Sequence, residues 1–576
     1  MLHSSSFSST LAQGTLLSGK SPLQVPVLIV GAGPTGLCTS ILLSRYDIPS
    51  LLVERHASTS IYPRATGVST RSMELFRQWG LDQRVRAAGF QLEDASAPVS
   101  LTLAQPEVAR ISLGFPQAQE ALAVSPVTPW AYPQDTLEPI LLERARSYAE
   151  AQIVFGTELT TLEQDGEGVI ATLIERTTGD TTLVRARYVV AADGIHSRVR
   201  EQLGIALQGP DHLADFLSIL FRADLKRLIA GRVHGLYVIQ HPEASGVFVL
   251  TSTNGRWVFG MQWHPKRGER LENYDRERCI TLVRTAAGMP DLDVELVGVQ
   301  SFTFAAQVAQ WYREGNVFLA GDAVHRMTPS GGMGMNTGIH DAHNLAWKLA
   351  AVLRGWADPC LLETYESERR PVGLRNTKRS DTKRPIGRHE GEARPHEENE
   401  ASWSDLEIDL GYCYESTAII PESLAEDGAA AGRSRFSCRA GRRAPHVWLT
   451  RDGNRLSTLD LYYRMLTLVT GSAGAAWCEA AEIIAKTHGV PLVAHLIGPE
   501  GELQDVDHHW SEAYGIDADG ALLIRPDGFV AWRQRGAVGD HRTVLMNVVE
   551  QIVGRNPSHL QPGVSLHLAE SEKRTY

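Results

Sequence analysis

Short apolar runs alternate with helical patterns in the first two hundred residues of the chain. Val25–Val30 and Ser50–Val53 are strand-like, and the stretch between them has the periodicity of an amphipathic helix. Arg187–Ala192 and Val317–Ala320 are two further apolar runs, and each is followed by a glycine within two residues. Strands that alternate with helices in this way predict an α/β fold.

Three further patterns lie between these runs. A helix is predicted to begin at about Ser69, and another covers Leu137–Tyr148, with Leu141 and Ala145 on one face. Leu101–Ala123 alternates apolar and polar residues loosely, which predicts a strand from another layer.

The pattern becomes antiparallel between residues 206 and 304. Turn residues separate four strand-like runs there, which are Leu217–Arg222, Gly235–Ile239, Gly246–Leu250 and Arg256–Trp263. We therefore expect a sheet domain over residues 206–304, with part of residues 92–130. The segments 25–205 and 305–385, which flank it, are expected to form one discontinuous domain.

A third domain is expected over residues 405–576, after a charged, turn-rich linker at 386–404. Its pattern is strand, helix, strand, hairpin and helix, at Pro445–Leu449, Ala476–His488, Val493–Ile497, Leu522–Trp532 and Thr543–Ile552. This βαββα order predicts a thioredoxin-like domain. Cys478 has no cysteine near it in sequence, so thiol exchange is not expected there.

Composition narrows the class of protein. The chain has 576 residues, 43% hydrophobic and 21% charged, which predicts a globular protein of several domains. Its net charge of −11 argues against a nucleic-acid surface. The 6 cysteines lie far apart, which indicates neither a zinc site nor a disulfide framework.

Targeting signals are not evident. No apolar run approaches the roughly 18 residues that a spanning helix needs. Residues 1–24 lack a basic start and a long apolar core, and they are interpreted as a disordered tail. We therefore expect a cytoplasmic protein with no membrane span.

The first candidate site is the sequence GAGPTG at residues 31–36, between a strand and a helix. Gly31 permits a tight turn, Gly33 lets the backbone approach a pyrophosphate, and Gly36 lets helix and strand pack closely. Glu54 ends the next strand, where a carboxylate would accept hydrogen bonds from a ribose. Because this acid favours a ribose without a phosphate, FAD or NAD is expected rather than NADP.

Two polar residues follow in loops. Arg64 comes just after the strand that ends at Glu54, where a cation could lie against a cofactor or simply face solvent. Gln134 stands at the start of the helix Leu137–Tyr148, where it could cap the helix or reach a ligand.

The third candidate is the stretch that begins with Gly321 and Asp322. A glycine-rich loop leads from there into a helix predicted to start at about Gly338. An acid at a strand end can hold a ribose or ribitol hydroxyl, and N–H groups at a helix start can hold an electron-rich group. The alternative is an ordinary strand-loop-helix connection with glycines in its turns.

Taken together, these features resemble the single-component FAD-dependent aromatic hydroxylases, the group of para-hydroxybenzoate hydroxylase and phenol hydroxylase. The motifs are GAGPTG with Glu54 and Arg55, Asp193-Gly194 with Ser197 and Arg200, and Gly321-Asp322. The branch with 2,4-dichlorophenol 6-monooxygenase and polyketide-tailoring hydroxylases is most similar, through PRATGVSTRSMELFRQWG, GDAVHRMTPSGGMGMNTGIHDAHNLAWKL, DLEIDLGY and GRRAPHVWL. The resemblance runs from about Val25 to Trp532.

The resemblance implies a Rossmann-like FAD-binding domain and a set of residues that hold FAD without a covalent bond. The pyrophosphate and adenosine ribose would be held by Gly31, Gly33, Pro34, Thr35, Gly36, Glu54 and Arg55. Arg64 and Gln134 would contact the flavin side, and Asp193 with Gly194 would serve both FAD and NAD(P)H. The ribitol and flavin ring would be held by Gly321, Asp322, Gly332, Gly334, Met335 and Asn336, and the loop of Pro329 would face the ring as the candidate catalytic element.

The implied activity is a monooxygenase that hydroxylates a phenolic or polyketide-like aromatic ring. NAD(P)H would reduce FAD, O2 would add at C4a, and the resulting hydroperoxide would transfer oxygen. His340 stands where close relatives have glutamine, so it could line the pocket or cap a helix at the surface. No residue can be named as a base, and a homodimer is possible. A Baeyer–Villiger or epoxidising enzyme, or a flavin-binding protein without turnover, are the alternatives.

Overall fold

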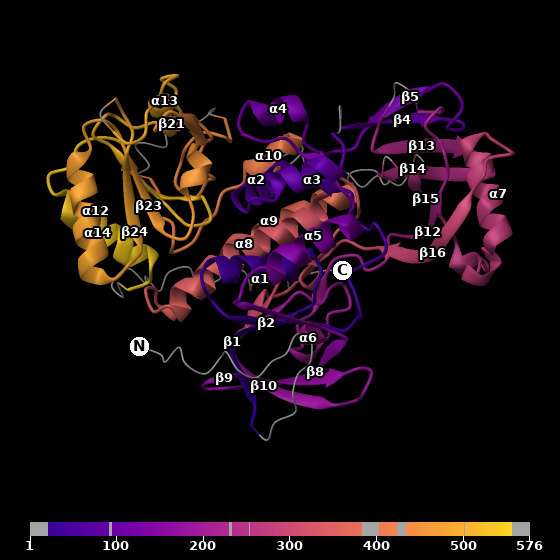
Figure 1. Cartoon of the computed structure of the whole chain (residues 1–576), viewed down its shortest axis with the longest axis horizontal. Coiled ribbons are helices and arrows are strands. Elements are labelled where there is room, and N and C mark those ends of the chain that lie inside the picture. The colour runs from indigo at the N-terminus through magenta and orange to yellow at the C-terminus, as the bar shows by residue number, and fades with distance from the viewer. Residues whose placement is uncertain are drawn as a thin grey trace, which may run out of the picture.

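The computed structural model describes residues 21–91, 95–229, 233–252, 254–382, 403–422, 434–499 and 501–555. An α/β body occupies the middle of Figure 1, a second sheet lies to its right, and a smaller α/β unit lies to its left. Of the helices in these ranges, none has the length and apolar composition needed to cross a membrane. The tail at residues 1–20 and most of the predicted linker at 386–404 lie outside the described residues.

The central sheet has eight strands. Its order is β18-β19-β10-β1-β2-β7, and β9 and then β8 continue from β10 as an antiparallel extension. The strands are β1 (Leu23–Val30), β2 (Ser50–Glu54), β7 (Ala151–Phe155), β8 (Thr157–Asp165), β9 (Gly168–Glu175), β10 (Thr181–Ala191), β18 (Arg313–Glu314) and β19 (Val317–Leu319). β1, β2, β7, β10 and β19 are parallel, as predicted for an α/β fold.

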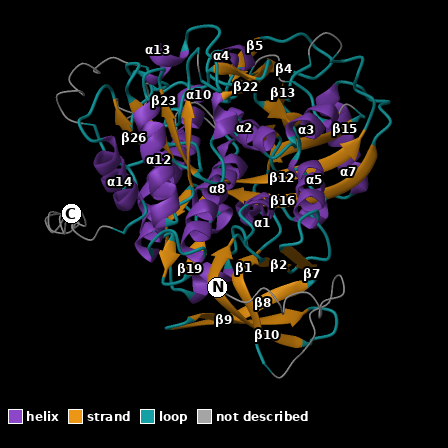
Figure 2. Cartoon of the chain, turned by 60° about the vertical axis from the view of Figure 1, so that its left-hand side comes forward, coloured by secondary structure: helices purple, strands orange, loops and turns teal. Residues whose placement is uncertain are grey.

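Helices cover this sheet, and four of them form its main packing layer. They are α1 (Pro34–Arg45), α5 (Gln134–Arg146), α8 (Met333–Leu353) and α9 (Thr364–Thr382). α1 packs against both α5 and α8 (Figure 2), and α8 packs against α9 (Figure 1). Seventeen residues of the 21-residue helix α8 are buried, so α8 runs through the interior of the molecule.

The second sheet has seven strands in the order β16-β12-β15-β14-β13-β4-β5. They are β4 (Ser96–Ser100), β5 (Ala109–Ser112), β12 (Ala214–Arg222), β13 (Leu236–His241), β14 (Ala244–Ser252), β15 (Arg256–Gln262) and β16 (Glu295–Phe304). Every pair is antiparallel except β13 with β4. Helix α7 (Arg276–Ala287) covers one face, where Leu217, Ile219, Phe221 and Trp257 form a buried cluster with its apolar residues.

The C-terminal unit is thioredoxin-like, as predicted, although its first strand was misplaced. Its elements are β23 (Leu466–Thr470), α12 (Ala475–His488), β24 (Leu492–Leu496), β25 (Ala521–Ile524), β26 (Val530–Gln534) and α14 (His541–Ile552). β23 is central and pairs with both β24 and β25. The predicted strand at Pro445–Leu449 belongs instead to a separate hairpin of β21 (Trp448–Arg451) and β22 (Asn454–Ser457).

The smaller elements connect these units. The short strands are β3 (Gly67–Val68) with β6 (Trp130–Ala131), and β11 (Leu207–Gln208) with β17 (Gln307–Ala309) and β20 (His325–Arg326). The short helices are α2 (Thr70–Gln78), α3 (Asp82–Ala88), α4 (Ala118–Leu122), α6 (Arg198–Gln202), α10 (Asp405–Leu410) and α13 (Trp510–Tyr514).

Three element boundaries differ from the predictions. Strand β1 begins at Leu23, inside the predicted tail, because Leu23 and Gln24 pair with β10. Leu101–Ala123 is not one strand, since it contains only the short strand β5 and the helix α4. Helix α8 begins at Met333 and not at Gly338, so it starts more than one turn earlier than its glycine-rich sequence suggested.

Buried charges join the C-terminal unit to the α/β body. Arg525, at the end of β25, donates to both carboxylate oxygens of Glu368 on α9, over 2.5 and 2.8 Å. Lys348 on α8 also donates to Glu368, over 2.8 Å, and Asp527 bonds Arg525 from the β25–β26 turn. The side chains of Arg525, Glu368 and Lys348 are 0% exposed. Burial alone would raise the pKa of Glu368, but the attraction of Arg525 and Lys348 outweighs burial and holds the pKa below its usual range.

Replacing Arg525 with alanine should destabilise the protein by about 3–5 kcal/mol, because Glu368 and Asp527 would lose their shared cation while remaining buried. The midpoint of urea unfolding measures this loss. Arg84→Ala is the matched control, because it removes an arginine whose ion pair with Glu143 is exposed. Equal midpoints for the two variants would show that the buried pair is not what joins the units.

A second buried acid, Asp409 of α10, lies at the start of α2. Its Oδ2 accepts the backbone N–H of Arg71 over 3.0 Å, while its Oδ1 has no partner among the described residues. Burial raises the pKa of Asp409 from 3.8 to about 6, and the bonds from the start of α2 reduce this effect only in part. The folded protein therefore favours the protonated acid more than the unfolded chain does.

This difference predicts a pH dependence. Because the folded pKa is the higher one, the contribution of Asp409 to stability is greatest below about pH 4 and is lost as the pH rises through about 6, a change of about 3 kcal/mol. Asp409→Asn should remove it, so the difference in unfolding free energy between wild type and variant should change between pH 4 and pH 7. A constant difference across that range would contradict the assigned titration.

Candidate functional site

The candidate site lies where the carboxyl ends of β1, β2, β10 and β19 meet. Gly31 adopts a φ of +104° and donates its N–H to the carbonyl of Val53 over 2.8 Å. A side chain at Gly31 would place its Cβ only 2.3 Å from the carbonyl oxygen of Ala192. The first motif is therefore held directly against the strand that leads to the second motif at Asp193.

The start of α1 leaves room for a ligand. Gly33 is the N-cap, Pro34 is the first helical residue, and no acidic side chain lies in the first turn. An added Cβ at Gly33 would meet no atom within 4 Å. Unpartnered N–H groups and a positive helix end beside open space match the needs of a pyrophosphate.

Glu54 braces the glycine turn from the neighbouring strand. Its Oε2 accepts the N–H of Ala32 over 2.8 Å, and its Oε1 accepts the N–H of His56 over the same distance. Each carboxylate oxygen can accept more than one hydrogen bond, so a ribose hydroxyl remains possible. Arg55 is half-buried, and its carbonyl accepts a hydrogen bond from Arg176.

Asp193 and Gly194 follow β10 at the same edge of the sheet. The Oδ2 of Asp193 accepts the N–H of Val199 over 3.2 Å, and its Oδ1 is buried without a partner among the described residues. Burial raises the pKa of Asp193. Ser197 caps α6, and Arg200 donates to the carbonyl of Ala323 over 3.1 Å, which ties this motif to the third one.

Asp322 is a solvent-accessible carboxylate whose pKa is raised. Its side chain is exposed, yet the surrounding protein raises its pKa by desolvation, against the attraction of His325, Arg64 and Arg326. The loop that contains Arg64 reaches the start of α8, because the carbonyl of Gly67 accepts a hydrogen bond from Nδ2 of Asn336 over 3.0 Å.

Arg64 is exposed, and Gln134 lies on α5 beside the same loop. Gln134 does not cap α5, because the N-cap is Pro133, and its Nε2 donates to Glu138 over 2.7 Å. Glu138 also accepts the N–H of Ser60 over 2.7 Å, so it holds both Gln134 and the loop that leads to Arg64. The sequence did not single out Glu138, although its spacing of four residues from Gln134 places both on one helical face.

The loop after Asp322 ends at the N-terminus of α8. Pro329 is exposed, and its carbonyl accepts the N–H of Gly332, which adopts a φ of +63° as the N-cap of α8. Met333, Gly334 and Met335 form the first turn, whose N–H groups have no acceptor within a helix. Their position beyond the glycine loop gives the site three fixed donors.

The Asn336 side chain is fully used inside the protein. Its Oδ1 accepts the N–H of Ser69 over 2.9 Å, and its Nδ2 donates to the carbonyls of Gly67 and Gly332 over 3.0 and 2.7 Å. Asn336 could therefore contact a ligand only through its backbone. It fastens the start of α2 to the start of α8.

One of the two predictions for His340, a helix cap at the surface, is wrong. It is 4% exposed and lies within α8, where its Nε2 is 3.1 Å from the hydroxyl of Ser72 on α2. It neither caps a helix nor reaches the surface. Burial lowers its pKa well below the usual value, so it is a neutral hydrogen-bonding group between two helices.

Three of the predicted segments meet at one point. A Cβ added to Gly338 of α8 would lie 2.4 Å from the Thr35 hydroxyl and 3.0 Å from the Gly321 Cα. The start of α1, the Asp322 loop and α8 therefore touch through glycine. Contacts within the protein itself therefore bring together residues that are far apart in sequence.

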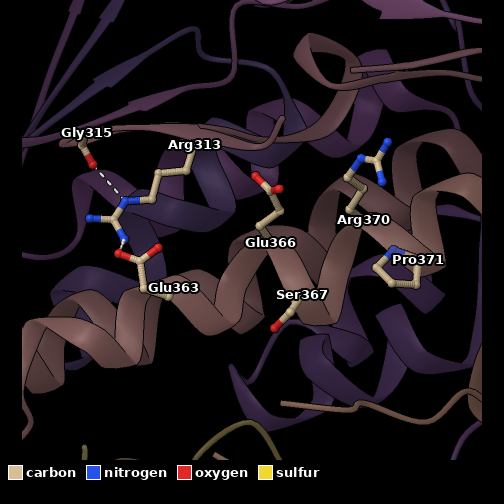
Figure 3. A pocket seen from close by; sticks show the side chains of 7 residues that line it. All are labelled: Arg313, Gly315, Glu363, Glu366, Ser367, Arg370 and Pro371. Carbon is tan, nitrogen blue, oxygen red and sulfur yellow. Dashed lines mark hydrogen bonds and ion pairs between the residues drawn. The ribbon is translucent and has the colours of Figure 1, made fainter. Parts of the chain in front are cut away.

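A cavity of about 430 Å³ lies elsewhere, between α9 and the Arg313–Gly315 turn (Figure 3). It contains none of the predicted site residues. Arg313 donates to the carbonyl of Gly315 over 2.7 Å and pairs with Glu363, while Glu366 accepts the N–H of Tyr312. Because none of the three motifs lines it, the cavity is not the candidate active site.

Comparison with protein families agrees with this geometry. Residues 24–380 match the family described as "FAD binding domain", and residues 437–556 match "Aromatic-ring hydroxylase, C-terminal". The first match covers every predicted site residue, from Gly31 to Asn336.

Individual relatives are similar along nearly the whole chain. A putative polyketide hydroxylase of Streptomyces halstedii is 40% identical over 91% of this chain and 96% of its own. A 4-methyl-5-nitrocatechol 5-monooxygenase of Burkholderia sp is 38% identical over 92% of this chain and 98% of its own. The flavin-dependent monooxygenase PieE, solved with FAD and substrate, superposes with a TM-score of 0.84, at 35% identity over 93% of this chain and 100% of its own.

The close contact of Gly338 with Thr35 and Gly321 provides a test of whether these three segments form the site together. Gly338→Ala should lower the affinity for FAD tenfold or more, because the added methyl group would push α8 away from Thr35 and Gly321. Titration of the apoprotein with FAD, followed by flavin fluorescence, measures the affinity. Gly166→Ala is the matched control, since an added Cβ there meets no atom within 4 Å. Unchanged affinity in Gly338→Ala would show that the three segments do not set the site together.

Proposed function

The chain belongs to the family of FAD-dependent aromatic-ring hydroxylases, and on that premise we propose that it hydroxylates a phenolic or polyketide-like aromatic substrate with NAD(P)H and O2. It is an enzyme of the monooxygenase class and uses FAD. The observation that carries the proposal is the meeting of three motifs around the accessible carboxylate Asp322, beside the start of α8.

The residues at this meeting point fit FAD by their chemistry. The start of α1 and Gly33 would hold the pyrophosphate, and Glu54 would hold the adenosine ribose. Asp322 would accept the ribitol hydroxyls, and the N–H groups of Gly334 and Met335 would hold the electron-rich edge of the flavin ring. Gly31, Pro34, Thr35, Gly36, Arg55, Gly321, Gly332 and Asn336 would shape these contacts.

The remaining predicted residues would serve the exchange of substrates. We assign the second nucleotide, NAD(P)H, to the surface beside Asp193 and Gly194, where the Oδ1 of Asp193 still lacks a partner. Arg64 and Gln134 would contact the flavin from the opposite loop, and the exposed Pro329 would face the ring. Six free thiols fit a reducing cytoplasm, which is where we place the reaction.

FAD supplies the electron transfer and the oxygen-transfer chemistry when it is bound. The chain orients the aromatic ring, fixes donors where negative charge develops and keeps water away from the reacting atoms. Backbone N–H groups at the start of α8 suit the second task, because their direction is set by the helix and does not change during the reaction.

The aromatic substrate is assigned to the face of the seven-stranded sheet opposite α7. The side chains of a strand alternate between its two faces, so Ser218 and Gln300 point away from the buried cluster on α7. They lie in one row with Gly260 and Val247. At one end of this face the ion pair between Arg256 and Asp135 joins the sheet to α5.

The chemistry of this row matches an oxygenated aromatic molecule. Gly260 and Val247 provide a flat apolar surface for a ring. The side chains of Ser218, Gln262 and Gln300 are half-buried and make no hydrogen bond to another described residue, so they can bond hydroxyl or carbonyl groups. Polar groups grouped at one edge of an apolar surface fix the orientation of a bound ring.

The proposal is tested with the purified enzyme. Acid precipitation should release FAD into the supernatant, and NADH or NADPH oxidation should then be followed with simple phenols and with fused-ring polyphenols. The proposal expects oxidation stimulated by one group of compounds, with a product heavier by one oxygen atom on the ring. A lactone product would indicate the Baeyer–Villiger alternative, and oxidation that no aromatic compound stimulates would contradict hydroxylation.

Gln300→Leu tests the substrate surface separately. Loss of one hydrogen bond should raise the KM for the aromatic substrate about tenfold, with the KM for NAD(P)H unchanged. An unchanged KM for the aromatic substrate would place that substrate elsewhere.

A further inference from the structure

Asp341 is a fully buried carboxylate on α8 that no predicted role includes. Its Oδ2 accepts the backbone N–H of Gly321 over 3.1 Å and lies 2.8 Å from the Nε2 of His325. Gly321 and His325 flank Asp322 on both sides. A single carboxylate oxygen therefore fastens both ends of the loop that carries Asp322.

The other oxygen of Asp341 is held from the opposite side. Its Oδ1 accepts Nε of Arg369 on α9 over 2.7 Å. Arg369 also donates to the carbonyl of Thr337 over 3.2 Å and to the Tyr414 hydroxyl over 3.1 Å. Asp341 thus lies at the centre of a fixed group that includes α8, α9 and the Asp322 loop.

We propose that Asp341 is a positioning residue for FAD, which sets the distance between the Asp322 carboxylate and the N–H donors at the start of α8. The inference rests on the proposed binding of the ribitol by Asp322 and of the flavin ring by Gly334 and Met335. These two groups belong to different segments of the chain, and a cofactor that spans them needs a constant spacing. Asp341 provides it because it belongs to α8 and bonds the loop directly.

The charge of Asp341 strengthens this connection. Burial alone would raise its pKa, but Arg369 and His325 outweigh burial and hold the pKa at about 2. The carboxylate is therefore ionised at neutral pH, and hydrogen bonds to a charged acceptor are stronger than those to a neutral one. An asparagine would have one acceptor oxygen and could not bond Arg369, Gly321 and His325 together.

A purely structural ion pair is the competing explanation, and the chain offers a matched control for it. Glu368 is also a fully buried carboxylate, and it pairs with Arg525 and Lys348. It stands next to Arg369 on α9, yet none of its hydrogen bonds reaches the Asp322 loop. Loss of either carboxylate should reduce stability, whereas only Asp341 should affect the cofactor.

The experiment compares wild type, Asp341→Asn and Glu368→Gln as apoproteins. Thermal unfolding measures stability, and quenching of flavin fluorescence during titration measures the Kd for FAD. The proposal expects both variants to unfold at lower temperature, while the Kd rises tenfold or more in Asp341→Asn and less than twofold in Glu368→Gln. Equal changes in Kd for the two variants would overturn it.

His325 provides a second pair of variants if Asp341→Asn fails to fold. His325→Leu removes the donor to Asp341 and leaves the pair with Arg369 intact, so it should weaken FAD binding at least fivefold. His325→Gln keeps a donor at nearly the same place and should restore the Kd to within twofold of wild type. Equal Kd values for Leu and Gln would contradict the positioning role. A wild-type protein that binds no FAD would instead refute the proposed function itself.

Discussion

The structure depends on buried ion pairs that join helix α8 to its neighbours and so fix their relative positions. Asp341 and Lys348 are both completely buried on this helix, and each would be strongly unfavourable alone. Two adjacent residues of α9 neutralise these charges: Arg369 pairs with Asp341, and Glu368 pairs with Lys348. Because a buried ion pair tolerates little displacement, the two helices have one relative position. The loop of Asp322 and the C-terminal unit then attach to that fixed pair.

This arrangement explains how a site can exist before its cofactor binds. The residues proposed to hold the pyrophosphate, ribitol and flavin ring come from three distant segments, and the chain brings these segments together through glycines and buried hydrogen bonds. The C-terminal unit is joined to this arrangement through Glu368, which accepts a hydrogen bond from Arg525 across the interface.

The sequence predicted local features well and long-range ones poorly. The glycine turn, the acids at strand ends and the fold class follow from spacing and periodicity. The predicted start of α8 was too late, because GGMGMN has no helical pattern and its N-cap, Gly332, has no side chain to signal a helix start. Strand β23 was not predicted, and the run Pro445–Leu449 was predicted instead as the first strand of the C-terminal unit. The partners of Asn336, His340 and Asp341 lie on segments far away in sequence, so no local pattern could identify them.

A crystal structure of the protein with FAD would test the central claim most directly. The account predicts FAD along the carboxyl ends of β1 and β10, with the ribitol at Asp322 and the pyrimidine edge of the flavin within hydrogen-bond distance of the Gly334 or Met335 N–H. The bond between Asp341 and Gly321 should be the same with and without FAD. A flavin bound away from the start of α8, or a loop that leaves Asp341 when FAD binds, would contradict it.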